Sequence, residues 1–362
     1  MEIDWKNVHR VLVVRLRSIG DTVLSTPSLI AFKRFLPEAQ IDILLEDWVA
    51  PLLNGFDAVD NVISIPKSAA SRARTAWQIW RTDYDVVFNL HGGTTGTFFT
   101  FASGAKHRVG FTEYQYNFLY NHLLSSSSDF WKQEITHSAE QQLALLGFVG
   151  VPVEDRPKSK LCVTEEMSAD MDLLLHAYGV DEERIALIHP AAAFKTKQWA
   201  PRNFALLIEH LKSRGLFSIL VVAPDEKDIV EEIADSTKTF FHGFRDLTLP
   251  EITALASHAE LFVGNDSGIA HIAAAVGTPS IVIFGSSNRD HWRPWTNAPN
   301  EMVYQKFPCQ PCPGYQCREF GDSRCISGVT PTSVFEAIER VLGAADKKSG
   351  HEARLFQDVA KN

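Results

Sequence analysis

The sequence predicts an α/β protein with two domains, each built on a doubly wound parallel sheet. Three observations support this prediction. The chain has 362 residues, which is more than one domain usually holds. Short apolar runs alternate with helical segments along both halves, as parallel strands alternate with their crossover helices. Turns rich in glycine follow strands in both halves, at the positions where open parallel sheets bind ligands.

Composition excludes several classes of protein. The chain is 45% hydrophobic and 22% charged, which is ordinary for a globular protein. A net charge of −9 disfavours a nucleic-acid-binding function. No apolar run reaches the length of a membrane span, and the N-terminus does not read as a signal peptide. We therefore expect a cytoplasmic protein.

The first domain is expected to begin with a strand at residues 8–16, whose nearly continuous apolar character predicts a central position in the sheet. A turn containing Gly20 and Asp21 follows, and then a helix that runs to about Phe35 and stops at Pro37. Asp21 has two interpretations. It either complements the dipole of that helix, or it presents a carboxylate at the ligand-binding edge of the sheet.

The rest of the first domain continues the alternation of strands and helices. A second glycine turn follows the fourth strand at residues 91–95. Further strands are expected at 41–45, 59–65, 86–90 and 106–111, and an amphipathic helix at 136–150.

Residues 67–81 form a basic segment without an acidic residue, in which Trp77 and Trp80 are interleaved. One interpretation is a solvated helix face whose tryptophans are buried. The other is a docking face for an anionic, amphipathic partner. The basic residues are Lys67, Arg72, Arg74 and Arg81.

We expect the first domain to span residues 1–155 and an inter-domain linker to span 156–183. The second domain would follow at 184–329, then a C-terminal helix at 330–343 and a mobile tail at 344–362. The expected strands of the second domain are 184–189, 217–222, 261–263 and 280–284, and its expected helices are 201–215, 225–234 and 249–259.

The stretch 261–285 reads as a buried strand, a polar turn, a short helix of small apolar residues and a second buried strand. The start of a helix carries unpaired N–H groups and a partial positive charge, and a glycine turn lets a phosphate approach them. The stretch therefore predicts an anion site. The alternative is an ordinary helix with Asp266 as its N-cap.

Common catalytic motifs are missing. The sequence contains no GxxxxGK[ST], no GxGxxG after either domain's first strand, and neither HExxH nor GxSxG. Asp83 and Asp85 resemble a metal-binding DxD pair, but they stand at the entry of a strand, so we interpret them as surface acids. What remains is Asp21, Lys197 and the turn at Asp266. A carboxylate that accepts a proton and a cradle that stabilises a departing phosphate suit group transfer without a metal ion.

Four of the five cysteines cluster near the C-terminus. Their spacing is compatible with a structural zinc ion, whereas reduced thiols in an irregular loop are the alternative. Disulfides are disfavoured in the cytosol. The clustered residues are Cys309, Cys312, Cys317 and Cys325.

Several of these segments together resemble one family. They are VLVVRLRSIGDTVLSTPSL at 11–29, DVVFNLHGG at 85–93, HPAAAFKTKQW at 189–199 and VGNDSGIAHIAAAVGTPSIVIFG at 263–285. They are similar to the bacterial ADP-heptose:lipopolysaccharide heptosyltransferases of glycosyltransferase family 9. The resemblance implies a GT-B fold, in which two Rossmann-like domains face a central cleft. One departure is that the family's glycine-rich HPG segment reads His189-Pro190-Ala191 here.

The resemblance also implies roles for individual residues. Asp21 matches the catalytic base, and Lys197 matches the lysine that contacts the donor phosphate and sugar. Glu226 falls where the family binds ribose, and Leu247 falls near the adenine pocket. The residues that match the donor aspartate and the diphosphate-binding helix start are Asp266, Ser267, Gly268, Ile269, Ala270 and His271.

By this resemblance the chain is an inverting, metal-independent transferase that needs no cofactor. It would move a heptose from ADP-L-glycero-β-D-manno-heptose to the lipopolysaccharide inner core, at the cytosolic face of the inner membrane. Lys67, Arg72 and Arg74 would meet the anionic glycolipid acceptor. The alternatives are a family 9 transferase with another nucleotide sugar or acceptor, a GT-B sugar-nucleotide epimerase, or an inactive nucleotide-binding module.

Overall fold

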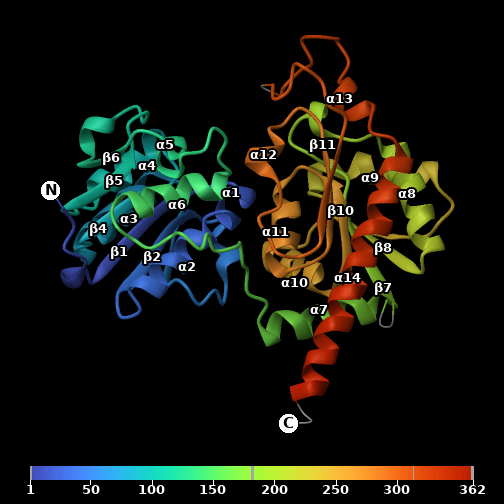
Figure 1. Cartoon of the computed structure of the whole chain (residues 1–362), viewed down its shortest axis with the longest axis horizontal. Helices are drawn as coiled ribbons and strands as arrows, with labels where there is room; N and C mark the ends of the chain where they lie inside the picture. Colours follow the sequence, from blue (N-terminus) through green and yellow to red (C-terminus); the bar gives the residue numbers. More distant parts are fainter. Residues whose placement is uncertain (1, 181–182, 313, 360–362) are drawn as a thin grey trace. The chain divides into compact units, whose positions relative to one another are not determined.

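The computed structural model describes residues 2–180, 183–312 and 314–359, with residues 346–359 described by their backbone alone. The chain forms two compact units, Met1–Cys162 and Val163–Asn362 (Figure 1). The division falls inside the segment expected to link the domains. Helix α7 (Glu165–Ala177), which occupies much of that segment, packs against α10 (Leu249–His258) and so belongs to the second unit.

Unit 1 contains a six-stranded parallel sheet in the order β3-β2-β1-β4-β5-β6. Strand β1 lies in the middle of the sheet, as its apolar run predicted, and Val11 to Val14 are completely buried. Strand β6 was not expected, because a three-residue strand is too short to show a pattern. The strands are β1 (Arg10–Leu16), β2 (Gln40–Glu46), β3 (Asn61–Ile65), β4 (Val86–Asn89), β5 (His107–Phe111) and β6 (His122–Leu124).

The single helix expected after β1 is in fact two helices, α1 (Ile19–Val23) and α2 (Thr26–Phe35). The expectation overlooked Pro27, which lacks an N–H and is tolerated only in the first turn of a helix. At the break, the hydroxyls of Ser25 and Thr26 donate hydrogen bonds to the carbonyls of Thr22 and Val23.

Among the helices of unit 1, α6 contacts both α2 and α5, and α3 contacts α4. Besides α1 and α2, these helices are α3 (Ala69–Thr82), α4 (Gly93–Ala102), α5 (Ser127–Trp131) and α6 (Ser138–Phe148), together with the 3-10 turns η1 (Trp5–Asn7), η2 (Ala50–Leu53) and η3 (Asn117–Leu119).

Helix α3 corrects the interpretation that its tryptophans are buried. Its inner face is formed by Thr75, Ala76 and Ile79, which occupy the positions against the sheet. Trp77 and Trp80 lie on the outer side of the helix and are 56% and 59% exposed. Small and aliphatic residues fill the space over the sheet, so the two indoles face solvent.

Unit 2 contains a second six-stranded parallel sheet, in the order β12-β11-β10-β7-β8-β9. Read from the other end, this is the strand order of unit 1. Strands β9 and β12 at the two edges were not expected. The strands are β7 (Arg184–His189), β8 (Leu216–Val221), β9 (His242–Phe244), β10 (Ala259–Asn265), β11 (Ser280–Phe284) and β12 (Asn300–Tyr304).

The helices of unit 2 cover a core in which Trp199, Phe204 and Ile338 are completely buried. Besides α7 and α10, the helices are α8 (Pro201–Ser213), α9 (Lys227–Ser236), α11 (Gly268–Val276), α12 (Arg289–Trp292), α13 (Arg324–Ser327) and α14 (Pro331–Val359), with the 3-10 turns η4 (Lys195–Lys197) and η5 (Pro224–Glu226).

Helix α14 is longer than expected, and Figure 1 draws it in red as one long helix. We expected the helix to end at Gly343 and a mobile tail to follow, but the helix continues to Val359. Gly343 is tolerated inside the helix, because the alanines that follow it favour helical backbone. Residues 360–362 lie outside the described residues.

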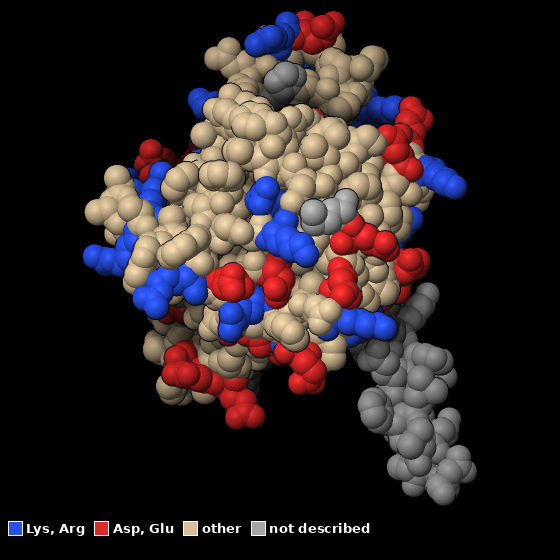
Figure 2. Space-filling model, turned by 90° about the vertical axis from the view of Figure 1, so that its left-hand side faces the viewer, with Lys and Arg blue, Asp and Glu red and all other residues tan. Residues whose placement is uncertain are grey.

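Surface charge is mixed, and Figure 2 shows Lys and Arg side chains interspersed with Asp and Glu on one face of the molecule. Among the helices that the structure describes, none is both long enough and apolar enough to cross a membrane.

Candidate functional site

In unit 2, a cluster of charged and hydroxyl groups surrounds the carboxylate that follows β10. Because β7, β10 and β11 are parallel, the loops after them emerge at one edge of the sheet. Lys197 Nζ lies 2.8 Å from Asp266 Oδ2, and the hydroxyl of Ser287 donates a hydrogen bond to the same oxygen. Only 6% of the Asp266 side chain and 19% of the Lys197 side chain are exposed. The buried carboxylate is therefore paired with a cation that itself reaches the surface.

The start of α11 has no side-chain cap. Its N-cap residue is Ser267, not Asp266, and the Ser267 side chain makes no capping hydrogen bond. Our alternative interpretation of Asp266 as the N-cap is thus wrong, because the carboxylate turns to Lys197 and Ser287 instead. In the described part of the chain the Ser267 hydroxyl has no hydrogen-bond partner. The first N–H groups of α11 are left available to an anion.

Other residues of the predicted helix start lie inside α11. Ile269, Ala270 and His271 are buried there. The side chains of Ile269 and Ala270 pack inward, so these two residues can offer a ligand only their backbone N–H groups.

Asn265 fixes the loop that carries Lys197. It is completely buried, its amide donates to the carbonyl of Pro190 at 2.7 Å, and its Oδ1 accepts from the N–H of Trp199 at 3.1 Å. Trp199 is anchored in turn, because its indole N–H donates to the carbonyl of Val329 at 2.8 Å. Both ends of the segment 190–199 are therefore held against β10, and Lys197 has little freedom of position.

The cysteine segment packs directly behind Lys197. The hydroxyls of Thr196 and Ser286 lie 2.9 Å apart, and Cys312 N–H donates to the carbonyl of Ser286 at 3.1 Å. A Cβ at Gly285 would come within 2.1 Å of the carbonyl oxygen of Thr196, so only glycine allows this approach. The segment thus supports the loop on which Lys197 stands.

The structural zinc considered for the cysteines does not fit their arrangement. All four line one small cavity together with Thr196 and Ser286, and all are free thiols. Across the described residues, no group of three or more His, Cys, Asp or Glu side chains is placed to hold a metal ion. Burial, the largest effect, and the neighbouring Cys312 raise the pKa of the Cys325 thiol, which favours its protonated form.

One member of the Asp83–Asp85 pair, Asp85, has a structural role. Asp85 accepts hydrogen bonds from the backbone N–H groups of His9 and Arg10, at 2.8 and 2.9 Å, and so holds the start of β1. Asp83 is exposed in a left-handed conformation at the end of α3.

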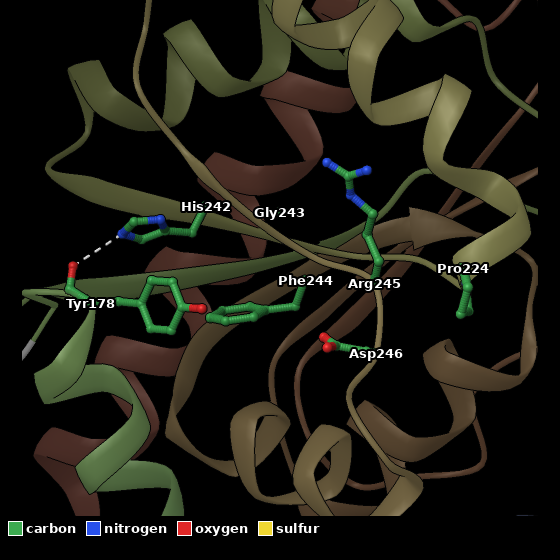
Figure 3. A pocket seen from close by; sticks show the side chains of 7 residues that line it. All are labelled: Tyr178, Pro224, His242, Gly243, Phe244, Arg245 and Asp246. Carbon is green, nitrogen blue, oxygen red and sulfur yellow. Dashed lines mark hydrogen bonds between the residues drawn. The ribbon is translucent and has the colours of Figure 1, made fainter.

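An open cavity of about 300 Å³ lies beside β9, and its lining residues are close in sequence to Glu226 and Leu247 (Figure 3). Glu226 accepts a hydrogen bond from the N–H of Ala223 at 2.9 Å and closes the turn η5. Neither residue lines the cavity, but Pro224 and Asp246, close to them in sequence, do. Among the described residues, the lining is formed by Tyr178, Pro224, His242, Gly243, Phe244, Arg245 and Asp246.

At the end of β7, His189 is neutral. Burial lowers its pKa, and its Nδ1 donates to the carbonyl of Val221 at 2.7 Å. Because a carbonyl oxygen can only accept, this contact fixes the tautomer.

In unit 1, the predicted base Asp21 forms an ion pair with Arg15. Arg15 is only 7% exposed, and its guanidinium also donates to the carbonyl of Leu90. Burial lowers the Arg15 pKa, whereas the charge of Asp21 opposes that effect. The Asp21 side chain is 23% exposed, so a buried cation holds a carboxylate that still reaches solvent.

The backbone between β1 and α1 is strained. Leu16 and Ser18 have φ angles of 70° and 81°, in the left-handed region that residues other than glycine rarely adopt. Strain of this kind is maintained where the surrounding structure imposes it, and such positions cluster at functional sites. Here it directs the chain so that Asp21 lies beside Arg15.

The glycine turn after β4 lies near the same pair. Burial, and then the charges of Arg15 and Arg17, lower the pKa of His91 to about 4, so its imidazole is neutral at pH 7. Gly92 has a φ of 68°, and a Cβ there would come within 2.9 Å of the ring of Tyr114.

The predicted acceptor-binding residues lie at the beginning of α3. Lys67 and Arg74 are exposed, and Arg72 is half-buried. Helix α3 follows β3, which runs parallel to β1, so its first residues emerge at the sheet edge where Asp21 lies. The predicted base and acceptor residues therefore belong to unit 1, and every predicted donor residue belongs to unit 2.

Comparison with known proteins identifies the family. Residues 72–321 match the family described as glycosyltransferase family 9 (heptosyltransferase). Lipopolysaccharide heptosyltransferase 3 of Escherichia coli (strain K12) is 30% identical, with the match covering 94% of this chain and 100% of that protein. The chain belongs to glycosyltransferase family 9. It is therefore a glycosyltransferase, which favours the transferase expectation over the epimerase and the inactive module.

Solved structures show the same fold. A family 9 glycosyltransferase from Veillonella parvula has a TM-score of 0.81 at 18% identity, covering 94% of this chain and 98% of its own. Escherichia coli ADP-heptose LPS heptosyltransferase II has a TM-score of 0.78 at 20% identity, covering 93% and 99%. The fold is GT-B, with two Rossmann-like domains, as expected.

Two residues of the candidate site were not predicted from the sequence. Arg15 is a charge within the buried part of β1, which is a signal that a buried partner exists. Ser287 follows the buried strand β11 at the ligand-binding edge, and that position could have drawn attention to it.

Proposed function

We propose that this family 9 enzyme transfers a heptose from ADP-L-glycero-β-D-manno-heptose to the lipopolysaccharide inner core, with inversion and without a metal ion. The names of its relatives support the substrates: besides heptosyltransferase 3, lipopolysaccharide heptosyltransferase 2 of Salmonella typhimurium is 23% identical over 92% of this chain. The geometry of the two sheet edges supports the mechanism.

The observation that carries the proposal is the cluster around Asp266 at the open start of α11. A diphosphate at this position would accept hydrogen bonds from the first N–H groups of α11 and from the Ser267 hydroxyl. Lys197, held by Asp266 at 2.8 Å, would neutralise the charge that develops on the leaving phosphate. These donors do the work that a divalent cation does in other transferases, so we propose that none is needed.

In the proposed reaction Asp21 is the general base. An acceptor hydroxyl attacks the anomeric carbon from the face opposite the diphosphate, and its proton passes to the Asp21 carboxylate. The new C–O bond forms as the bond to the β-phosphate oxygen breaks, and that electron pair leaves with ADP. One displacement inverts the anomeric centre. Arg15 would hold the carboxylate in position throughout.

We propose that the adenosine of the donor lies at the end of β8 and β9. Glu226 would bind the ribose hydroxyls, and Leu247 would contact the adenine. The open cavity between their loops, with Phe244 and Tyr178 on its wall, gives room for a flat ring (Figure 3).

The acceptor would be a glycolipid with anionic groups, bound while the enzyme rests on the cytosolic face of the inner membrane. Lys67, Arg72 and Arg74 emerge at the same sheet edge as Asp21, so they are placed to meet phosphate or carboxylate groups of the acceptor.

A thermal-shift series tests the donor. A ligand that binds only the folded state raises the apparent stability by RT ln(1 + [L]/Kd). ADP and ADP-heptose should raise the melting temperature more than UDP, GDP and their sugars do. A preference for UDP or GDP would replace the proposed donor by another nucleotide sugar.

Two further measurements test inversion and metal independence. NMR of the isolated product should show the anomeric configuration opposite to that of the donor, and retention would overturn the single-displacement mechanism. Transfer should continue at its normal rate in saturating EDTA. Loss of activity that magnesium or manganese restores would overturn the metal-independent mechanism.

A further inference from the structure

Helices α3 and α4 of unit 1 expose aromatic side chains that fold stability does not require. Trp77 and Trp80 on α3 are 56% and 59% exposed, and Phe98 and Phe101 on α4 are 51% and 56% exposed. Apolar groups of this size are normally withdrawn from water, and exposed ones that gather in one place mark an interaction surface. We call these four residues the aromatic patch.

The four residues lie on the outside of one helical layer. Helices α3 and α4 contact each other, and Ala76, Ile79 and Phe99 pack in the same core cluster against the sheet. Within each helix the two exposed rings are three residues apart, which places them side by side on the helix surface. Trp80 also reaches the end of α4, because a Cβ at Gly104 would lie 3.2 Å from its ring.

Only positive charges accompany the aromatic patch within these helices. Residues 67–82 and 93–106 contain basic residues and no acidic one. The Arg81 guanidinium lies over the Trp77 ring, 5.1 Å from its centroid. The nearest acid in the sequence is Asp83, just past the end of α3. The basic residues are Lys67, Arg72, Arg74, Arg81 and Lys106.

Aromatic rings that alternate with Lys and Arg fit one partner in particular. Trp and Phe insert into the boundary between headgroups and acyl chains, while basic residues are attracted to anionic headgroups. A nucleic acid would demand a continuous basic track, and a protein partner would demand no particular excess of positive charge. The chemistry of the patch therefore favours a lipid bilayer with an anionic surface.

The position of the aromatic patch in the fold is compatible with a bilayer as the partner. Helix α3 begins at the sheet edge where Asp21 lies and runs away from it, so its basic residues lead from that edge toward the tryptophans. A bilayer along the outer side of α3 would contact both the basic residues near that edge and the tryptophans near the far end of the helix. We propose that the outer surface of α3 and α4 docks this enzyme on an anionic phospholipid bilayer, a step that binds the enzyme to the membrane independently of the acceptor.

The proposal adds to the proposed function, but its test does not depend on it. Vesicles of phosphatidylglycerol and phosphatidylcholine, with no glycolipid and no nucleotide, are mixed with the purified full-length chain and floated on a density gradient. The chain should float with these vesicles at low salt and not with pure phosphatidylcholine. Failure of the transfer reaction would leave this binding unchanged, so the two proposals fail separately.

Two variants locate the surface. Trp77→Ala with Trp80→Ala should weaken vesicle binding at least about tenfold, because two interfacial rings are lost. Arg74→Gln with Arg81→Gln should weaken it roughly 30-fold, since each basic residue near an anionic surface contributes about fivefold. All four side chains are exposed, so the melting temperature should not change.

Matched controls come from unit 2. Leu206→Ala with Phe240→Ala removes exposed apolar residues, and Arg202→Gln with Lys212→Gln removes exposed charges; both should bind vesicles as the unchanged chain does. A third variant of the aromatic patch, Trp77→Phe with Trp80→Phe, keeps two aromatic rings. Its vesicle binding should persist, while the quenching of its tryptophan fluorescence by brominated lipid should be strongly reduced.

Three results would overturn the proposal. The first is no binding of the unchanged chain to anionic vesicles at low salt. The second is equal binding by the patch variants and their controls. The third is a dimer in light scattering that the Trp77→Ala, Trp80→Ala variant abolishes, which would make the patch an interface between copies of the chain.

Discussion

The two units share one strand order but place their charged groups differently. In each sheet the first strand of the unit, β1 or β7, lies beside the fourth, β4 or β10. In unit 1 the cation, Arg15, comes from the first strand, and the acid, Asp21, comes from the helix α1 that follows it. In unit 2 the cation follows the first strand and the acid follows the fourth. The same scaffold thus holds two different arrangements of a cation and an acid.

A buried asparagine ends the fourth strand in both units. Asn89 accepts hydrogen bonds from the N–H groups of His91 and Gly92, and so fixes the turn that follows it; its amide also donates to the hydroxyl of Tyr120. Asn265 instead bonds to Pro190 and Trp199, and so fixes a distant loop. In unit 2 the asparagine therefore joins the loop after β7 to the end of β10. A phosphate site built from these two segments requires such a connection.

The two arrangements predict different roles for Asp21 and Asp266. The largest effect on activity should come from a substitution in unit 1. Asp21→Asn is nearly isosteric and should lower kcat at least about 100-fold, because no carboxylate is left to accept the proton of the acceptor hydroxyl. ADP affinity, which we assign to unit 2, should stay unchanged. Steady-state kinetics and calorimetry on the same preparation give both quantities. Asp83→Asn, also an acid of unit 1, is the control; a near-normal kcat in Asp21→Asn would remove Asp21 as the base.

The next effect should come from the cation of unit 2. Lys197→Ala removes a charge-assisted contact to the leaving phosphate and should weaken ADP binding roughly 10- to 100-fold, with a similar loss in kcat/KM. Calorimetric titration with ADP measures the first effect. Lys195→Ala, two residues earlier and exposed, is the matched control. Equal ADP affinity in the two variants would place the diphosphate elsewhere.

A smaller effect should follow from the hydroxyl that supports Asp266. Ser287→Ala removes a hydrogen bond to a buried carboxylate and should weaken ADP binding by up to about tenfold. Ser287→Thr keeps the hydroxyl and should restore most of the affinity. If both variants bind ADP equally well, the hydroxyl does not position the cluster.

The last effect concerns stability, not ligand binding, and the histidine of unit 1. The pKa of His91 is lowered from 6.5 to about 4, so between these values the unfolded chain binds a proton that the folded chain does not. Stability should therefore fall as the pH drops below 6.5. In His91→Gln the loss between pH 6.5 and about pH 5 should be smaller by at most about 2 kcal/mol. Urea unfolding at the two pH values measures this, and equal losses would contradict it.

Interior strands could be predicted from the sequence, and so could the edge strand β3, but the edge strands β6, β9 and β12 could not. Strands β1, β7 and β11 are continuous apolar runs because both of their faces are covered. Strands β6 and β9 have three residues each, and β12 is half-exposed, so their sequences carry no periodic pattern. Their existence depends on the neighbouring strand, which local sequence does not show.

The candidate site shows the same limit. Turn residues and glycines mark Asp21 and Asp266 as residues at a ligand-binding edge. The contact between Lys197 and Asp266 joins residues 69 positions apart, and only the folded sheet brings them together. The outward orientation of Trp77 and Trp80 was also hidden, since it depends on which residues fill the space over the sheet.

The place of α14 in the second core has a consequence for synthesis on the ribosome. The sheet of unit 1 is complete at Leu124, well before the first strand of unit 2 is made. In unit 2, by contrast, Val334 and Ile338 of α14 are completely buried in the core around Trp199. N-terminal domains generally fold first during synthesis, and incompletely covered apolar surfaces promote aggregation. Unit 2 therefore keeps part of its core open until α14 emerges, and that interval is when a chaperone would act on it.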